Sequence, residues 1–191
     1  MVSAEKPPSE LLTEAMAMIE TDGWIGFSAR RLARKTGRPV EEIYDDLPDR
    51  AAVLSALGRH ADRAMLGIDG DELDEMSVRE RLFEMLMRRL DAMKPFRPAL
   101  LTIAREGRSD PKAATATLCN LDRALGRLMD MADIPVRGPR RVAVGAAIVF
   151  GYLRAVRVWL NDDSEDAAKT MAALDKALAR LDGMLGQARA A

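Results

Sequence analysis

Charged side chains are divided unevenly over two neighbouring segments near the start of this 191-residue sequence. No acid occurs between Ser28 and Arg38, and the segment carries five cations: Arg30, Arg31, Arg34, Lys35 and Arg38. Clustered cations of this kind can bind the phosphate groups of nucleic acids. The segment that follows carries four acids instead, at Glu41, Glu42, Asp45 and Asp46. These acids would repel the phosphates that the first segment attracts.

Residues that would support catalysis or metal binding are few. One histidine, His60, and one cysteine, Cys119, are too few for a zinc site of soft ligands or for an intramolecular disulfide. The acidic run at residues 162–166 suits the start of a helix, where the dipole favours negative charge, better than a cation site. No Gly-rich phosphate loop, nucleophile motif or pair of catalytic carboxylates stands out. We therefore predict a protein that is not an enzyme and has no metal or cofactor.

The composition favours helices packed around a buried core. Apolar residues make up 48% of the chain, charged residues 31% and aromatic residues 4%, a mixture that favours helix over sheet. No run of 18 apolar residues is free of charge, so no membrane span is expected. The N-terminus has no apolar core of a secretory signal. We expect an all-α, cytoplasmic protein.

Helix start and stop signals divide the chain into about nine helices. Ser9 and Ser28 are expected to cap the first two, while Gly23 and Gly37 end them. Ser77 and Glu80 form a capping box, in which each side chain accepts from the other's backbone N–H. The expected helices span about residues 9–22, 28–36, 40–46, 48–66, 77–93, 98–106, 110–132, 139–160 and 168–185.

Three residues at fixed spacing, Ala33, Gly37 and Ile43, are typical of a helix-turn-helix. The first helix needs a small residue where the second helix crosses it closely, and the turn needs a glycine for its positive φ. The second helix needs a branched apolar residue that anchors it on the first. We therefore predict that residues 28–46 form a helix-turn-helix.

With this motif, residues 9–58 resemble the N-terminal part of TetR-family transcriptional regulators. The resemblance is carried by DGW before Ser28 and then by Leu32-Ala33, Gly37, Ile43-Tyr44, Leu47-Pro48, Arg50 and Val53-Leu54. It implies a three-helix DNA-binding-like domain with a helix-turn-helix over residues 1–58. It also implies a helical bundle for ligand binding and dimerisation over residues 59–191. The resemblance further implies a homodimer that binds operator DNA and responds to a small apolar ligand.

Some residues depart from the family pattern in the part that should contact DNA. Arg38 stands where the family buries Val, and Pro39 stands where Ser usually caps the second helix. The acids of that helix oppose phosphate attraction, although a glutamate can accept from a cytosine amino group. We expect weak DNA binding, and the candidate contacts are Ser28, Arg30, Arg31, Arg34, Lys35, Arg38, Val40, Glu41, Glu42, Tyr44 and Arg50.

The resemblance also implies a ligand pocket and a dimer interface in the second part of the chain. Of the twelve methionines, several fall in this part, and methionine adapts to irregular ligands. The candidate pocket residues are Phe83, Met87, Leu121, Leu125, Phe150 and Tyr152. The last two long helices carry small or apolar stripes, which make the candidate dimer contacts Ala143, Ala147, Gly151, Leu174, Leu178 and Leu181.

Two other interpretations remain open. Residues 79–100 and 158–181 are similar to TetR-like lipid-binding proteins of ubiquinone biosynthesis. That similarity implies a protein that holds an isoprenoid or lipid in its C-terminal part and has lost DNA binding. A third interpretation is a ligand-responsive protein that acts through contacts with another protein.

Overall fold

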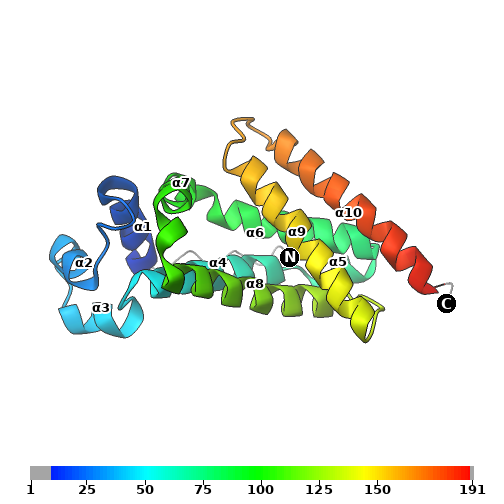
Figure 1. Ribbon diagram of the computed structural model, residues 1–191, viewed down its shortest axis with the longest axis horizontal. Helices are drawn as coiled ribbons and strands as arrows, with labels where there is room; N and C mark the ends of the chain where they lie inside the picture. Colours follow the sequence, from blue (N-terminus) through cyan, green and yellow to red (C-terminus); the bar gives the residue numbers. More distant parts are fainter. Residues whose placement is uncertain (1–9, 190–191) are drawn as a thin grey trace. The chain divides into compact units, whose positions relative to one another are not determined.

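The computed structural model describes residues 10–189, and these residues form helices and turns without strands (Figure 1). The predicted cap at Ser9 lies outside the described residues. Two short 3₁₀ turns, at Lys94–Phe96 and Gly107–Ser109, flank α7. The α-helices of the described range are α1 (Glu10–Asp22), α2 (Ala29–Thr36), α3 (Val40–Asp46), α4 (Arg50–Leu66), α5 (Gly70–Asp74), α6 (Val78–Met93), α7 (Arg97–Glu106), α8 (Pro111–Met131), α9 (Pro139–Trp159) and α10 (Ala168–Arg189).

The all-α prediction is confirmed, and all nine expected helices are present within the described range. The additional helix is α5, which lies in a short segment between two of the expected helices, 48–66 and 77–93. It begins where the side chain of Asp69 accepts a hydrogen bond from the N–H of Asp71 at 3.2 Å. Helix α4 begins at Arg50 instead of Pro48, because the Asp49 carboxylate caps it by accepting from the N–H of Ala52.

The chain folds as two compact units. The described part of the N-terminal unit comprises residues 10–63 and 92–120, and that of the C-terminal unit comprises residues 64–91 and 121–189. The predicted division between residues 58 and 59 falls inside α4, as does the division after Arg63. The N-terminal unit also includes α7, which packs against α1.

Trp24, which follows α1, connects this helix to α7 within the N-terminal unit through a hydrogen bond. Its indole is almost completely buried, and its backbone N–H donates to Glu106 Oε2 at 2.8 Å. The preceding residue, Gly23, ends α1 with a φ of 81°. A Cβ at Gly23 would lie 2.9 Å from the same carboxylate oxygen. Both the backbone angle and the available space therefore favour glycine here.

A close contact between α4 and α8 also belongs to the N-terminal unit. Asn120 is buried, and its Nδ2 donates to the carbonyl oxygen of Leu54 at 2.9 Å. A Cβ added at Gly58 would lie only 2.7 Å from Asn120 Cγ. The glycine thus lets the amide side chain of Asn120 reach the backbone of α4.

The C-terminal unit is dominated by the pair α9 and α10, which lie side by side along most of their length (Figure 1). Gly151 permits this close packing, because a Cβ there would lie 2.8 Å from Ala177 Cβ. The turn before α10 is held by Asp162, whose Oδ2 accepts from both the N–H and the hydroxyl of Thr170. Hydrogen bonds from the Ser164 and Thr170 side chains hold the pKa of Asp162 below its ordinary value.

The capping box predicted at the start of α6 is confirmed. The N–H of Ser77 donates to Glu80 Oε2 at 2.8 Å, and the N–H of Glu80 donates to Ser77 Oγ at 3.3 Å. These hydrogen bonds satisfy backbone donors that a helix start would otherwise leave without partners.

Two helix glycines make a matched test of this packing. Gly58→Ala should lower the free energy of unfolding by about 1–3 kcal/mol, because the new methyl group overlaps the buried Asn120 amide. Gly126→Ala, in an open position on α8, should raise it by about 0.5–1 kcal/mol, because alanine favours helix. Urea unfolding of both variants measures the two changes. An unchanged midpoint for Gly58→Ala would contradict the described packing.

Candidate nucleic-acid interface and ligand cavity

A helix-turn-helix lies in the N-terminal unit, where α2 and α3 are joined by a tight turn. Ser28 begins α2, since its Oγ accepts from the N–H of Arg31 at 3.3 Å. Gly37 ends α2 with a φ of 71°, and its N–H donates to the carbonyl oxygen of Ala33. A Cβ at Gly37 would meet nothing within 4 Å, so the backbone angle alone favours glycine. Ala33 and Ile43 are both buried, as the predicted motif requires.

Two arginines of the predicted DNA surface are paired with acids of α1. The guanidinium of Arg31 lies 2.8 Å from Asp22 Oδ2 and also donates to the carbonyl oxygen of Gly26. Arg38, just after α2, lies 2.7 Å from Glu10 Oε2. Exposed ion pairs contribute about 0–1 kcal/mol each, so exchanging them for a phosphate costs little.

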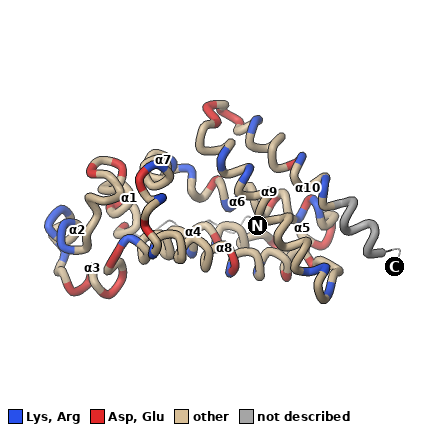
Figure 2. The backbone as a smooth tube through the Cα atoms, in the orientation of Figure 1, with Lys and Arg blue, Asp and Glu red and all other residues tan. Residues whose placement is uncertain are grey.

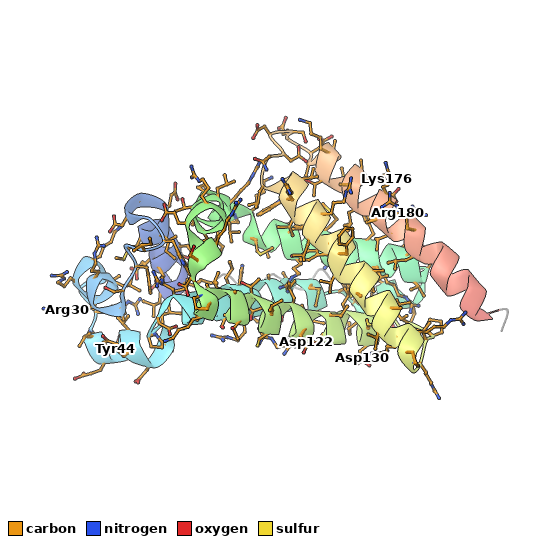
Figure 3. The ribbon with its side chains drawn as sticks, viewed as in Figure 1. Arg30, Tyr44, Asp122, Asp130, Lys176 and Arg180 are labelled. Carbon is orange, nitrogen blue, oxygen red and sulfur yellow. The ribbon has the colours of Figure 1, made fainter. Side chains whose placement is uncertain are left out.

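The remaining cations of α2 point to solvent. Arg30 and Arg34 are exposed and form no ion pair with any described residue, and Figure 3 shows Arg30 reaching outward from α2. Lys35 is exposed too, and its Nζ lies 3.4 Å from Thr21 Oγ1. Arg30 and Arg34 are therefore the cations of this helix that are most accessible for binding an anion.

Arg50 is held within the N-terminal unit. Its Nε lies 3.1 Å from Asp110 Oδ2, whose side chain is only 13% exposed, and its guanidinium lies 5.6 Å from the centroid of the Trp24 ring. Both interactions stabilise the Arg50 guanidinium in its position beside Asp110 and Trp24. This geometry counts against the phosphate contact that the resemblance implied for Arg50.

Helix α3 presents acids and two apolar side chains to solvent. Ile43 is fully buried, whereas Val40 is 42% exposed and Tyr44 is 54% exposed. The four acids, at positions 41, 42, 45 and 46, are exposed and form no ion pair with any described residue. Figure 2 shows the resulting division, with Lys and Arg on α2 and Asp and Glu on α3. A phosphate approaching α3 therefore meets negative charge.

The predicted dimer residues lie mostly inside the chain's own packing. Leu174, Leu178 and Leu181 of α10 are buried in the single chain, at 0–3% exposure. Gly151 is covered by Ala177 of α10, while Ala147 is half-buried and Ala143 is exposed. The small-residue stripe of α9 therefore faces α10 at Gly151.

A different face of α9 carries exposed apolar side chains. Val142 is 74% exposed, Phe150 is 67% exposed and Leu153 is 45% exposed. With Ala146, which is also exposed, their spacing places them along one side of the helix. We call this set the α9 stripe; it lies about a quarter turn or more from Gly151.

Helix α9 also satisfies the length and composition expected of a membrane span, unlike the other described helices. Core helices of soluble proteins can have the same composition, and 39% of its most apolar window is buried inside the structure. The composition is thus weak support for a membrane segment.

An apolar cavity lies in the C-terminal unit. Of the predicted pocket residues, Leu121, Leu125 and Tyr152 line it, but Phe83, Met87 and Phe150 do not. Phe150 is absent from the cavity because it lies on the exposed α9 stripe. The lining residues missed by the sequence reading are Met65, Leu86, Arg89, Ala124, Leu128, Ile148 and Val149.

Arg89 is the unexpected member of this wall, being a cation that is only 4% exposed. It follows Leu82 and Leu86 at the spacing of one helix face, which was the signal available in the sequence. Its Nε donates to the hydroxyl oxygen of Tyr152 at 3.2 Å, and its guanidinium lies 5.9 Å from the centroid of that ring. Burial raises the pKa of Tyr152, and the positive charge of Arg89 partly offsets the rise.

His60, the histidine considered for metal binding, makes contacts within the N-terminal unit. Nε2 of His60 lies 3.1 Å from the carbonyl oxygen of Ala92, and its ring packs edge-on against Phe96. Among the described residues, no group of three or more His, Cys, Asp or Glu side chains could hold a metal ion.

Of the comparisons with known proteins, the one with solved structures shows the fold. No protein-family model matches the chain, and no curated protein matches it. Among solved structures, the chain is similar to the TetR transcriptional regulator from Nitrosomonas europaea ATCC 19718, with a TM-score of 0.71 and 16% sequence identity. The similarity covers 89% of this chain and 94% of that chain. The chain therefore has the fold of a TetR transcriptional regulator, which confirms the fold that the sequence resemblance implied.

The environment of Tyr152 can be measured directly in a Tyr44→Phe variant, because the chain has only two tyrosines. Since burial favours the neutral phenol, Tyr152 should ionise above the ordinary phenol value of about 10. Stability should then fall as the pH rises above that value, because the unfolded chain releases its proton first. Phenolate absorbance, followed together with circular dichroism, makes the measurement. Ionisation at about 10 in a protein that remains folded would contradict the buried site.

Proposed function

We propose that the protein is a cytoplasmic, TetR-like transcriptional regulator that binds operator DNA as a homodimer. The observation that carries the proposal is the α2–α3 helix-turn-helix, with Gly37 in the left-handed conformation between Ala33 and Ile43. Its support is the similarity in fold, over 89% of the chain, to a TetR transcriptional regulator. A helix-turn-helix of this kind places its second helix in the major groove.

Few side chains favour that contact electrostatically. Arg30 and Arg34 are exposed and lie on the helix that would cross the DNA backbone, where they can bind phosphates. Tyr44 and Val40 offer apolar contacts to thymine methyl groups. The acids of α3 are not screened at short range, because the Debye length in physiological salt is about 8 Å. We infer modest affinity, limited by α3 and carried mainly by α2.

The α9 stripe is the surface we assign to the dimer. A second copy could cover Val142, Phe150 and Leu153 with the same residues of its own α9, giving a two-fold contact. The outer face of α10 would supply a polar rim, since Figure 3 shows Lys176 and Arg180 on its outer side. Two-fold symmetry would present two helix-turn-helix units to a palindromic operator.

The apolar cavity of the C-terminal unit is the site we assign to a regulatory ligand. A ligand that binds one conformation of the dimer better than the other would shift the spacing of the two helix-turn-helix units. The non-enzymatic role predicted from the sequence is part of this proposal.

The lipid-binding alternative has less to support it. The segment around Trp159 and Asp162, on which that similarity partly rests, has a structural role in this chain. Trp159 is buried, and Asp162 holds the start of α10 through Thr170. These features are needed to form the α9–α10 pair whatever the function is.

Reversing charge on α3 tests the proposed DNA surface. Glu42→Lys with Asp45→Lys should bind unrelated duplex DNA more tightly than the wild type, because two repulsive charges become attractive. The slope of log K against log salt should steepen by about 1 for each lysine that reaches a phosphate. Both residues are exposed, so folding should be unaffected.

The matched control changes the same charge elsewhere, by Asp74→Lys with Glu75→Lys, and should leave DNA binding close to that of the wild type. Removing the exposed cations with Arg30→Ala and Arg34→Ala should abolish measurable binding. A wild type that binds its own upstream DNA at nanomolar level, and loses this preference in the Glu42 and Asp45 variant, would show that the acids read bases.

The dimer surface is tested by Phe150→Asp, which places a charge in the middle of the α9 stripe. Sedimentation should show a monomer, because a buried unpaired carboxylate strongly opposes association. Leu118→Asp is the matched control, since Leu118 of α8 is also 67% exposed. It should remain a dimer. A monomeric wild type, or a Phe150→Asp protein that still dimerises, would rule out this interface.

A further inference from the structure

The hydroxyl hydrogen of Tyr152 has no acceptor among the described residues. The side chain is 6% exposed and lines the apolar cavity, and its oxygen accepts from Arg89 Nε. A phenol has one O–H donor in addition to its lone pairs. With one lone pair engaged by Arg89, the O–H remains as a buried donor, which is unfavourable unless it finds an acceptor.

The rest of the cavity wall offers no such acceptor side chain. Apart from Arg89 and Tyr152, the lining is entirely apolar: Met65, Leu86, Leu121, Ala124, Leu125, Leu128, Ile148 and Val149. The empty volume is about 270 Å³ including the open mouth. Its interior is narrow, with room for about one water molecule. A larger occupant must move side chains, and methionine and leucine can change rotamer.

We propose that this cavity binds a small, mainly apolar molecule with one hydrogen-bond acceptor oxygen, to which the hydroxyl of Tyr152 donates. The inference rests on the ligand response in the proposed function and names the chemical class of that ligand. An apolar wall with one placed polar group is the usual composition of a small-molecule site. The space inside the cavity is far below the usual range for a ligand pocket, so the site selects a compact molecule, and side chains of the wall must change rotamer to admit it.

Arg89 acts in this site as a positioning residue. Its N–H holds the oxygen of Tyr152, so that the phenol's own hydrogen is available to a ligand. The buried guanidinium also polarises the phenol and strengthens it as a donor. Because burial raises the pKa of Tyr152, the phenol keeps its hydrogen at neutral pH. A ketone, aldehyde or ester oxygen would complete the hydrogen bonding.

Two probes of nearly equal shape separate this hydrogen bond from simple apolar packing. Acetophenone carries a carbonyl oxygen, and α-methylstyrene has a CH₂ group in its place. Titration of the full chain, followed by the methyl NMR signal of Met65, gives both dissociation constants. The variant Tyr152→Phe should weaken acetophenone binding about tenfold and change α-methylstyrene binding less than about twofold.

A second variant tests the location. Val149→Met narrows the cavity and should weaken both probes together, and circular dichroism checks that each variant is folded. If Tyr152→Phe leaves acetophenone binding unchanged, or weakens both probes equally, the acceptor inference is wrong while a ligand cavity remains. If neither probe binds the wild type, both the inference and the assigned ligand site fail, and Tyr152 holds at most a water. If the Tyr152→Phe variant does not fold, the two dissociation constants of the wild type decide. Acetophenone binding that is more than tenfold weaker than α-methylstyrene binding then overturns the inference.

Discussion

In the proposed function, electrostatic repulsion between the acids of α3 and DNA phosphates limits the affinity for DNA. The turn at Gly37 brings a basic helix and an acidic helix together within one small unit. Of the basic side chains, Arg31 and Arg38 are paired with acids of α1, and Arg50 is held by Asp110. The proposed affinity therefore depends on a small number of arginines, with Arg30 and Arg34 foremost. Most of the affinity of DNA-binding proteins comes from such phosphate contacts.

Different faces of α9 have different surroundings in the C-terminal unit. Gly151 allows α9 to pack closely on α10, while the α9 stripe stays exposed on another face. Tyr152, next to Gly151 in the sequence, lines the apolar cavity and accepts from Arg89. A ligand in the cavity would thus contact α9, the same helix whose stripe we assign to the dimer interface. This arrangement offers a short physical route between ligand binding and dimer geometry.

Local sequence signals predicted the helices well because their causes are local. Ser28, Gly37 and Ser77 act through hydrogen bonds or backbone angles within four residues of their own position, and Asp162 acts on Thr170, eight residues further along the chain. The short helix α5 was not predicted, because five residues are too few to show the repeating apolar pattern of a helix, although Asp69 caps it and Leu73 is buried.

Partners from distant segments were not predictable in this way. The pairing of Arg50 with Asp110 and the place of Arg89 beside Tyr152 depend on how helices pack. The stripe of small residues ending at Gly151 was read as a dimer face. Spacing alone cannot distinguish a close contact within the chain, as with Ala177, from one between chains.

The salt dependence of DNA binding tests the central claim most directly. The wild-type protein is titrated with duplex DNA from its own upstream region over a series of salt concentrations. If Arg30 and Arg34 of each protomer make the main phosphate contacts, the dimer has four, and log K should fall against log salt with a slope of about −4. A slope of about −8 or steeper, with tight binding at physiological salt, would show that many more cations reach the backbone and that α3 does not limit the affinity.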